Sequence, residues 1–348
     1  MTYRFHVLLL LLATVGALAS CESTTGTTPA PFDSTIVNTG DRALFIVDEG
    51  HFQSNNSSMD AIVFRTTTAV DTVSHKDVLT GLGEGNDIWL VGNRAYILDN
   101  GGQIVIANAD SLKKIGSIPL GITQPDKMAL IGAGRFVVTE RSGSSAKVVD
   151  VNAAKIVDSL PVADGSVCVG VLAGKVFITS EPSTSRGSMS VFDANSKALI
   201  NTISLDANPE DLVVDSVHNQ IIVGCSGDYN MVAPSAAFID ASNLAVKKKI
   251  TLGAVGDQFA FVLGPQLYVL VSSAALVVDL STYANAAVPI PGGNSYYNGI
   301  YDAKTNALYL GRTNYTSAGT VDVFDATSMK IRWSFKTGIA PAHFAFYH

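Results

Sequence analysis

Carboxylates, arginines, histidines and tyrosines recur along the chain, in or beside polar stretches that separate apolar runs. Carboxylates accept hydrogen bonds, arginines donate them, and tyrosine rings stack on flat molecules. A surface built from such side chains would bind a polar ligand rich in amide or hydroxyl groups. For any single residue the alternative is an ordinary solvated side chain. The candidate ligand-binding residues are Asp48, Glu49, His51, Asn86, Asp87, Asp126, Glu140, Arg141, Asp228, Tyr229, Tyr296, Tyr297, Arg312 and His343.

Motifs for catalysis are absent from the sequence. It contains no Gly-x-Ser-x-Gly elbow, no His-Glu-x-x-His, no phosphate loop and no dinucleotide fingerprint. His51 and His343, with nearby carboxylates, could bind a metal ion, but no ligand spacing supports this. We therefore expect a binding protein rather than an enzyme, with no catalytic residue, no metal and no cofactor.

The apolar runs between these residues repeat at a regular spacing. Each repeat reads as four short strands; in one unit these are 87–91, 95–98, 103–107 and 114–120. Seven units of this kind predict an all-β fold, a seven-bladed β-propeller with four-stranded blades. The second strands begin near Leu44, Tyr96, Phe136, Val176, Ile221, Leu267 and Leu308.

The order of strands predicts how the ring closes and which loops share a face. The first unit lacks a first strand, and residues 342–347 form a first strand with no unit after it. The C-terminal strand should therefore complete the N-terminal blade and leave no open sheet edge. The loop into strand one and the loop between strands two and three should lie on one face, where long polar loops often carry function. These loops also hold Lys127, Glu181, Arg186, Glu210, Asp211, Asp257, Gln258, Asn298 and Tyr315.

Aspartates that close the predicted third strands have a structural explanation. Small or turn-forming residues follow each within two positions, as expected for an aspartate that caps a tight turn through the backbone. They are Asp150, Asp193, Asp240, Asp279 and Asp325.

The N-terminal segment reads as a targeting signal. Arg4 precedes a short apolar run over 7–15, too short to span a membrane, and the run leads to Leu18-Ala19-Ser20-Cys21. This end resembles the bacterial lipoprotein cleavage box, which implies that Cys21 becomes the lipid-modified N-terminus and carries palmitate. The alternative is an ordinary secretory signal. We expect a signal peptide over 1–20, a Thr/Pro/Ser-rich tether over 21–40 and the propeller over 41–348, in a lipoprotein exported to the outer membrane or cell surface.

Composition limits the classes of molecule that the protein is expected to bind. The net charge of −7 and the isoelectric point near 5.3 disfavour nucleic acid, which is usually bound by a basic face. We expect a monomer that contacts the membrane through its lipid alone. In an exported protein Cys168 and Cys225 could form a disulfide or remain buried free thiols.

The units resemble the YVTN-type β-propeller repeats of bacterial surface proteins. Residues 47–52 (VDEGHF) and 56–60 (NSSMD) resemble the opening of a family of exported seven-bladed propeller lipoproteins, and 82–88 and 226–229 look like its later motifs. Some members are surface proteins that bind cobalamin and pass it to an outer-membrane transporter. The resemblance implies a corrinoid or another scarce nutrient as ligand and such a transporter as partner. Asp48 and His51 depart from the family, which tends to have Asn there.

Two other functions fit the same fold. One is a metal-dependent propeller hydrolase, similar to a lactonase, with its metal in the central channel. The other is a structural module that binds proteins of the cell envelope.

Overall fold

The computed structural model shows a protein built from β-strands. It describes residues 36–52, 54–65, 71–181, 186–228, 232–252, 259–271, 274–290 and 296–347. Among these residues there is no helix long and apolar enough to cross a membrane. The predicted signal peptide, the lipidation site Cys21 and most of the predicted tether lie outside the described residues.

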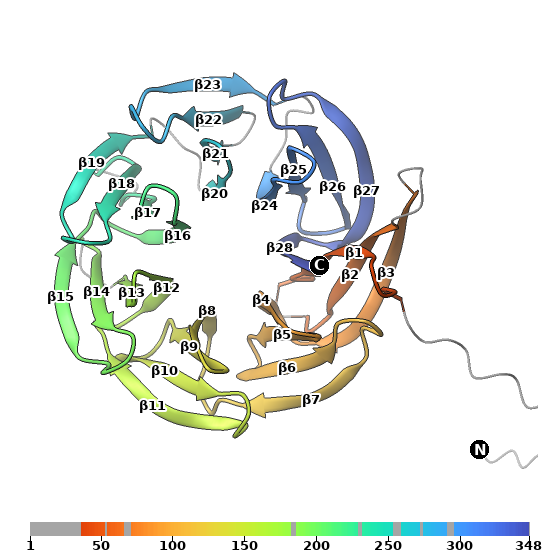
Figure 1. Ribbon diagram of the computed structural model, residues 1–348, viewed down its shortest axis with the longest axis horizontal. Helices are drawn as coiled ribbons and strands as arrows, with labels where there is room; N and C mark the ends of the chain where they lie inside the picture. The colour runs from red at the N-terminus through yellow and green to blue at the C-terminus, as the bar shows by residue number, and fades with distance from the viewer. Residues whose placement is uncertain are drawn as a thin grey trace, which may run out of the picture. The chain divides into compact units, whose positions relative to one another are not determined.

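The 28 strands form seven antiparallel four-stranded sheets arranged as the blades of a ring (Figure 1). The prediction of an all-β, seven-bladed propeller is confirmed. Blade 1 holds β28 (Pro341–Tyr347), β1 (Arg42–Asp48), β2 (Ser57–Arg65) and β3 (Asp71–Leu82); blade 2, β4 (Gly85–Val91), β5 (Arg94–Asp99), β6 (Gln103–Asn108) and β7 (Lys114–Pro119); blade 3, β8 (Pro125–Gly132), β9 (Arg135–Glu140), β10 (Ser145–Asp150) and β11 (Lys155–Pro161); blade 4, β12 (Ser166–Leu172), β13 (Lys175–Ser180), β14 (Ser188–Asp193) and β15 (Leu199–Ser204); blade 5, β16 (Pro209–Asp215), β17 (Gln220–Cys225), β18 (Ser235–Asp240) and β19 (Val246–Thr251); blade 6, β20 (Phe259–Leu263), β21 (Leu267–Val271), β22 (Ala274–Val278) and β23 (Asn285–Pro289); and blade 7, β24 (Tyr296–Asp302), β25 (Ala307–Arg312), β26 (Ala318–Asp325) and β27 (Ile331–Ile339).

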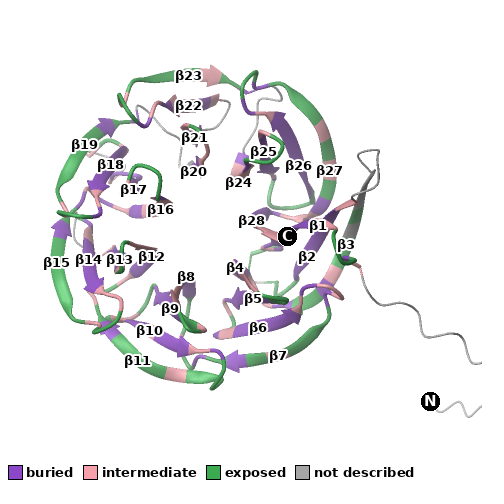
Figure 2. Cartoon of the chain, in the orientation of Figure 1, coloured by how far each residue is buried: buried purple, intermediate pink, exposed green. Residues whose placement is uncertain are grey.

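Burial follows the position of a strand in its blade. The second strands are buried on both faces because neighbouring blades pack against them; five of the six residues of β5 are buried. The outermost strands face solvent, and in β15 only Ile203 is buried (Figure 2). Continuous apolar runs in the sequence therefore mark the second strands.

The C-terminal strand closes the ring, as predicted. Strand β28 pairs with β1 in a register that sets Ala43 opposite Tyr347 and Val47 opposite His343. Across the neighbouring seam, the Arg42 guanidinium forms an ion pair with Asp302 of β24. The same guanidinium lies over the rings of Phe64 and Phe346, 4.8 and 4.6 Å from their centroids.

The propeller unit begins before residue 41. The backbone N–H groups of Ile36 and Val37 both donate to the carbonyl of Asp110, at 2.9 and 3.0 Å. The Val37 side chain is buried in the core of blades 1 and 2. The last residues assigned to the tether thus pack on the propeller, because an apolar residue there can be removed from water.

The third-strand aspartates cap turns, as predicted. In blade 4, Oδ1 of Asp193 accepts the backbone N–H groups of Asn195 and Ser196 at 3.0 and 2.7 Å. These bonds hold the pKa of Asp193 below its usual value. Equivalent pairs of backbone hydrogen bonds reach Asp150, Asp240, Asp279 and Asp325.

Candidate ligand-binding site at the channel mouth

The innermost strands place one residue each at the same level of the central channel. Five of these residues pair with the penultimate residue of the adjacent second strand, as Asp87 does with Leu98 and Asp211 with Gly224. The other two donate their backbone N–H groups to the penultimate residues Thr139 and Thr179. We name this set the channel ring; it consists of Asp87, Lys127, Cys168, Asp211, Ala260, Asn298 and His343.

A β-bulge lies where six of the innermost strands reach the ring. The register shifts between Gly85 and Asp87 in β4 and between Pro209 and Asp211 in β16, and equivalent shifts occur in β8, β12, β24 and the β28–β1 pair. A bulge bends the strand and redirects the next side chain. The repeated bulges thus aim ring residues into the channel.

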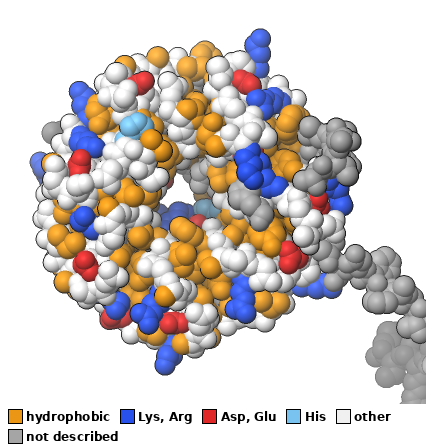
Figure 3. Space-filling model, viewed as in Figure 1, with side chains coloured by type: hydrophobic (Ala, Val, Ile, Leu, Met, Phe, Trp, Pro, Cys, Tyr) orange, Lys and Arg blue, Asp and Glu red, His pale blue; other side chains and the backbone are white. Residues whose placement is uncertain are grey.

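The channel mouth is a polar cavity of about 430 Å³. The loops into the first strands and the loops between second and third strands both line it, which confirms that they share a face. Figure 3 shows the ring hollowed at its centre, with charged and histidine side chains visible deep inside. The lining residues are Glu49, Phe52, Glu84, Asn86, Asn100, Gln124, Pro125, Asp126, Lys127, Arg141, Glu210, Asp211, Ala260, Tyr297, Asn298, Ala342 and His343.

A second cavity, of about 450 Å³, continues along β4, β8, β12 and β16. We call it the shaft. Apart from Asp87, Lys127, Cys168 and Asp211, it is lined by apolar side chains and Gly170. Lys127 and Asp211 line both cavities and therefore stand where the polar mouth meets the apolar shaft.

Lys127 is held as a cation within the mouth. Its Nζ donates to the backbone carbonyl of Asn86 at 2.8 Å and lies 3.9 Å from Oδ1 of Asp126. Burial alone would lower the pKa of Lys127, but the charges of Asp126, Asp87 and Glu49 outweigh burial and raise it. A lysine whose pKa is raised keeps its proton, so Lys127 supplies a fixed positive charge rather than a nucleophilic amine.

Glu49 joins two blades at the mouth. Its Oε1 lies 3.1 Å from Nε2 of His343, and its Oε2 accepts the hydroxyl of Tyr297 at 2.7 Å. Burial alone would raise the pKa of Glu49, but these two hydrogen bonds and the His343 charge lower it. Tyr297 also packs edge-on against Tyr315, with ring centroids 5.4 Å apart. The carboxylate is thus ionised and held in one position.

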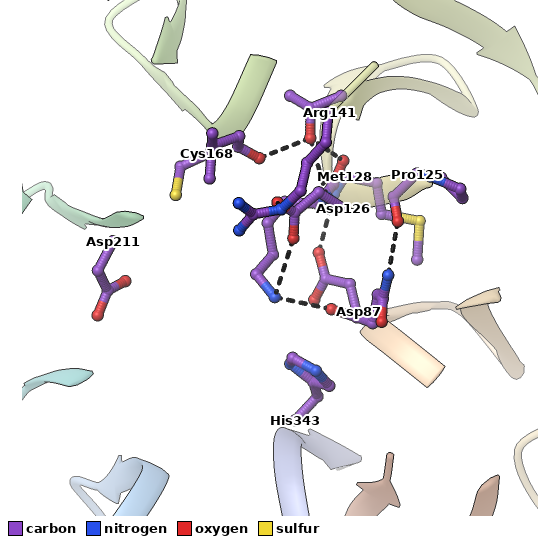
Figure 4. Close-up of polar contacts among 12 residues, drawn as sticks. Asp87, Pro125, Asp126, Met128, Arg141, Cys168, Asp211 and His343 are labelled. Carbon is purple, nitrogen blue, oxygen red and sulfur yellow. Dashed lines mark hydrogen bonds and ion pairs between the residues drawn. The ribbon is translucent and has the colours of Figure 1, made fainter. Parts of the chain in front are cut away.

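Arg141 bridges two carboxylates on the rim. Its Nε lies 2.6 Å from Oδ2 of Asp126, and its Nη1 lies 3.5 Å from Oε2 of Glu181. Figure 4 shows Asp126 and Arg141 together beside the space that Asp211 and His343 border from other blades. Both cations of the mouth therefore already have carboxylate partners.

Asp87 and Asp211 tie neighbouring blades together in the same way. Oδ2 of Asp87 accepts the backbone N–H of Met128 at 2.9 Å, and Oδ2 of Asp211 accepts that of Phe261 at 2.6 Å. Each Oδ1 accepts the N–H of the following residue. Burial raises the pKa of both carboxyls, that of Asp211 to about 6.

The structure brings six of the candidate residues into the mouth. They are Glu49, Asn86, Asp126, Arg141, Tyr297 and His343, while Asp87 lines the shaft. Lys127, Glu210, Asp211 and Asn298 also line the mouth; the sequence places them on the loop face but does not mark them as site residues. Lys127, Asp211 and Asn298 share a signal, one residue per first strand at the same register, whereas Glu210 precedes Asp211 and is not part of the channel ring.

The other candidates that the structure describes line neither the mouth nor the shaft. Arg312 and Tyr296 both bind Asp322, with Nε and the hydroxyl 2.9 and 2.8 Å from its Oδ2. Asp48 is buried beside Gly338, so close that a Cβ atom at position 338 would lie 2.8 Å from the carboxyl carbon of Asp48. Glu140 accepts the backbone N–H of Thr123 at 3.1 Å and borders a separate groove. The remaining three are His51, which is exposed; Asp228, which accepts the N–H of Val232; and Tyr229, which lies outside the described residues.

Cys168 and Cys225 both lie in the part of the chain that the structure describes. Cys168 and Cys225 are buried free thiols, so they do not form a disulfide. Burial raises the pKa of both, that of Cys225 to about 12. In the described ranges no three side chains of His, Cys, Asp or Glu are grouped to hold a metal ion.

No family model matches the chain, and no curated protein matches it in sequence. Solved structures match its fold. A candidate 6-phosphogluconolactonase from Bacteroides fragilis is 12% identical with a TM-score of 0.67, over 92% of this chain and 100% of that one. Hydrazine synthase from Kuenenia stuttgartiensis is 13% identical with a TM-score of 0.65, over 74% and 88%. Apo AztD from Citrobacter koseri is 12% identical with a TM-score of 0.55, over 88% and 98%. At these identities the likeness shows a shared β-propeller fold.

Proposed function

We propose that this protein is a lipid-anchored binding protein of the cell envelope that holds a small polar ligand in the mouth of the propeller channel. The observation that carries the proposal is the mouth itself, a cavity of about 430 Å³ with charged side chains from several blades. Small-molecule sites commonly measure roughly 300–1,000 Å³ and gather a few polar groups in this way.

The polar groups of the mouth are fixed by the protein before any ligand arrives. Glu49 is held by His343 and Tyr297, and Asp211 by two backbone N–H groups. A ligand that meets ordered groups loses less free energy to the ordering of side chains. Such preorganisation favours binding as the role of this face.

A corrinoid is the ligand that the resemblance to exported propeller lipoproteins offers. The amide groups at its edge could donate to the carboxylates of Glu49, Glu84 and Asp126, all of which line the mouth. An outer-membrane transporter would then be the partner that receives it. The loop face around the mouth would then contact both the corrinoid and the transporter.

Calorimetric titration of the purified full chain with cyanocobalamin tests this ligand. One-to-one binding that weakens in Asp126→Asn would support a corrinoid in the mouth. Asp164→Asn is the matched control, because Asp164 is exposed on a loop of the same face and lines neither cavity. Absence of heat with wild-type protein would remove the corrinoid and leave the mouth open to other ligands.

The lipid anchor is tested independently of the ligand. Cells that express the protein are labelled with a palmitate analogue, and membrane and soluble fractions are compared for wild type and Cys21→Ser. Label and membrane association should both be lost in the variant. Equal membrane association of the two proteins would contradict an anchor at Cys21.

A further inference from the structure

Asp126 lies beside both Lys127 and Arg141, whereas no ion pair among the described residues reaches the mouth carboxylates of Glu84, Glu210 or Asp211. Of these three carboxylates, Asp211 is the one that lines both the mouth and the shaft. Two backbone N–H groups fix its carboxylate, one to each oxygen. Each oxygen can accept a further hydrogen bond. Asp211 is therefore a rigid acceptor at the channel wall.

The mouth as a whole carries an excess of negative charge. Five carboxylates line it, from Glu49, Glu84, Asp126, Glu210 and Asp211, against at most three cations, Lys127, Arg141 and His343. A cleft lined mostly by one sign of charge concentrates ligands of the opposite sign. The mouth should therefore favour a cationic group over an anionic one.

The shaft begins at the level of Asp211 and is apolar. Trp89, Leu130, Val171 and Val214 line it, on four neighbouring innermost strands. An unpaired cation would not be stable among these side chains, but a hydrocarbon chain would be, because its surface leaves water there. The shaft accepts the apolar half of a ligand whose charged half stays in the mouth.

We propose that the ligand is an amphipathic organic cation, with an ammonium or guanidinium head beside Asp211 and an apolar tail in the shaft. The proposal rests on the proposed binding role of the mouth and narrows the ligand to a class other than the corrinoid. The head would donate to Asp211 and to neighbouring carboxylates of the mouth. Lys127, the other residue that lines both cavities, would repel a head seated beside its own ammonium group.

The test is a calorimetric titration of the purified full chain with three matched series: alkylammonium chlorides, sodium alkanoates and alkanols of one to eight carbons. Hexylammonium should bind and hexanoate should not. Affinity for the ammonium series should rise about fourfold with each added methylene until the shaft is full. Equal affinity for hexylammonium and hexanoate, or affinity independent of chain length, would overturn the proposal.

Variants locate the head group. Asp211→Asn should weaken hexylammonium binding at least about tenfold, since the charge-assisted hydrogen bond is lost. Asp164→Asn should bind as wild type. Thermal unfolding shows whether each variant folds. If Asp211→Asn does not fold, Glu49→Gln replaces it, and this variant should also weaken hexylammonium binding. Unchanged affinity in the folded mouth variants would exclude a head group in the mouth.

The outcomes separate this inference from the proposed function. If cyanocobalamin or an alkanoate binds and no alkylammonium does, the inference fails while the binding role of the mouth stands. If none of the probes binds, both fail for these ligand classes.

Discussion

Nε2 of His343 lies 3.1 Å from Oε1 of Glu49, although 294 residues separate them in the chain. Glu49 directly follows β1, and His343 lies in β28, the strand that completes the same blade. The pair therefore belongs both to the closure of the ring and to the wall of the channel mouth. A change at this pair should affect stability as well as binding.

His343→Ala should lower the free energy of unfolding by about 1–3 kcal/mol, the usual effect of losing a hydrogen bond to a charged group. His343 is buried, and Glu49 would keep only its bond from Tyr297. Urea unfolding measures the change. His51→Ala is the matched control, because His51 is exposed and its removal should change stability by less than about 0.5 kcal/mol. Equal effects of the two substitutions would contradict a role for His343 in closure.

Arg42→Ala should destabilise the seam between blades 1 and 7 more strongly, by about 3–5 kcal/mol, because it leaves the buried Asp302 carboxylate without its cation. Arg42→Lys keeps the charge but loses the planar group that lies over Phe64 and Phe346, so its loss should be intermediate. Urea unfolding of the three proteins gives the order. A loss below about 0.5 kcal/mol for Arg42→Ala would show that the ion pair does not hold the seam.

Asp48→Asn should stabilise the protein at neutral and higher pH. Burial, together with the nearby Asp60 carboxylate, raises the pKa of Asp48 well above its usual value of 3.8. The folded state therefore prefers the protonated acid, and wild-type stability falls as pH rises from the unfolded pKa through the folded one. Asparagine is neutral throughout and escapes this loss.

Unfolding free energies of wild type and Asp48→Asn, measured at pH 3.5 and pH 8, check the prediction. The two proteins should differ least at pH 3.5, and the variant should be the more stable at pH 8. Asp164→Asn, at an exposed position, should show no such change with pH. A variant that is less stable at pH 8 would mean that the charged form of Asp48 is accommodated in the fold.

The affinity for a cationic probe should rise with pH through about 6, the pKa to which burial raises Asp211. Below that pH the carboxyl is protonated and affinity should fall by up to about tenfold per pH unit. Hexylammonium titrations from pH 4.5 to 8 give the profile. Asp211→Asn should flatten it, which separates Asp211 from the other ionisable groups that line the mouth, namely Glu49, Glu84, Asp126, Lys127, Arg141, Glu210 and His343. A profile that is the same in the variant would assign the pH dependence to those groups.

The architecture could be predicted because its signal is repeated and local. A second strand that is buried on both faces must be apolar at nearly every position, as in the run Phe136-Val137-Val138 of β9. The closing strand was also predictable, because an incomplete first unit and a surplus last strand complement one another. Both arguments need only strand order and hydrophobicity.

The site was predictable only to the correct loops. Tyr296 and Tyr297 are neighbours, yet Tyr296 binds Asp322 inside blade 7 and Tyr297 binds Glu49 in the mouth. Asp48 is likewise buried away from the mouth, whereas its neighbour Glu49 lines the mouth. Alternation along a strand would normally place neighbouring residues on opposite faces of the sheet. The bulges at the mouth shift the register beside Asp48 and Tyr296, so alternation does not show which of two neighbours faces the channel. Alternation along a strand therefore could not identify Asp211 and Lys127 as residues that face the channel; their signal lies in the equivalent positions of the first strands.

The pairing of β28 with β1 also has a consequence for biosynthesis. The first blade is made early but stays one strand short until the ribosome has produced all six others. Until then Glu49 lacks His343, and the channel has a gap in its wall. A chain interrupted before β28 would carry most of the propeller and yet have an incomplete mouth. If the mouth binds a ligand as proposed, only molecules that contain β28 would capture it.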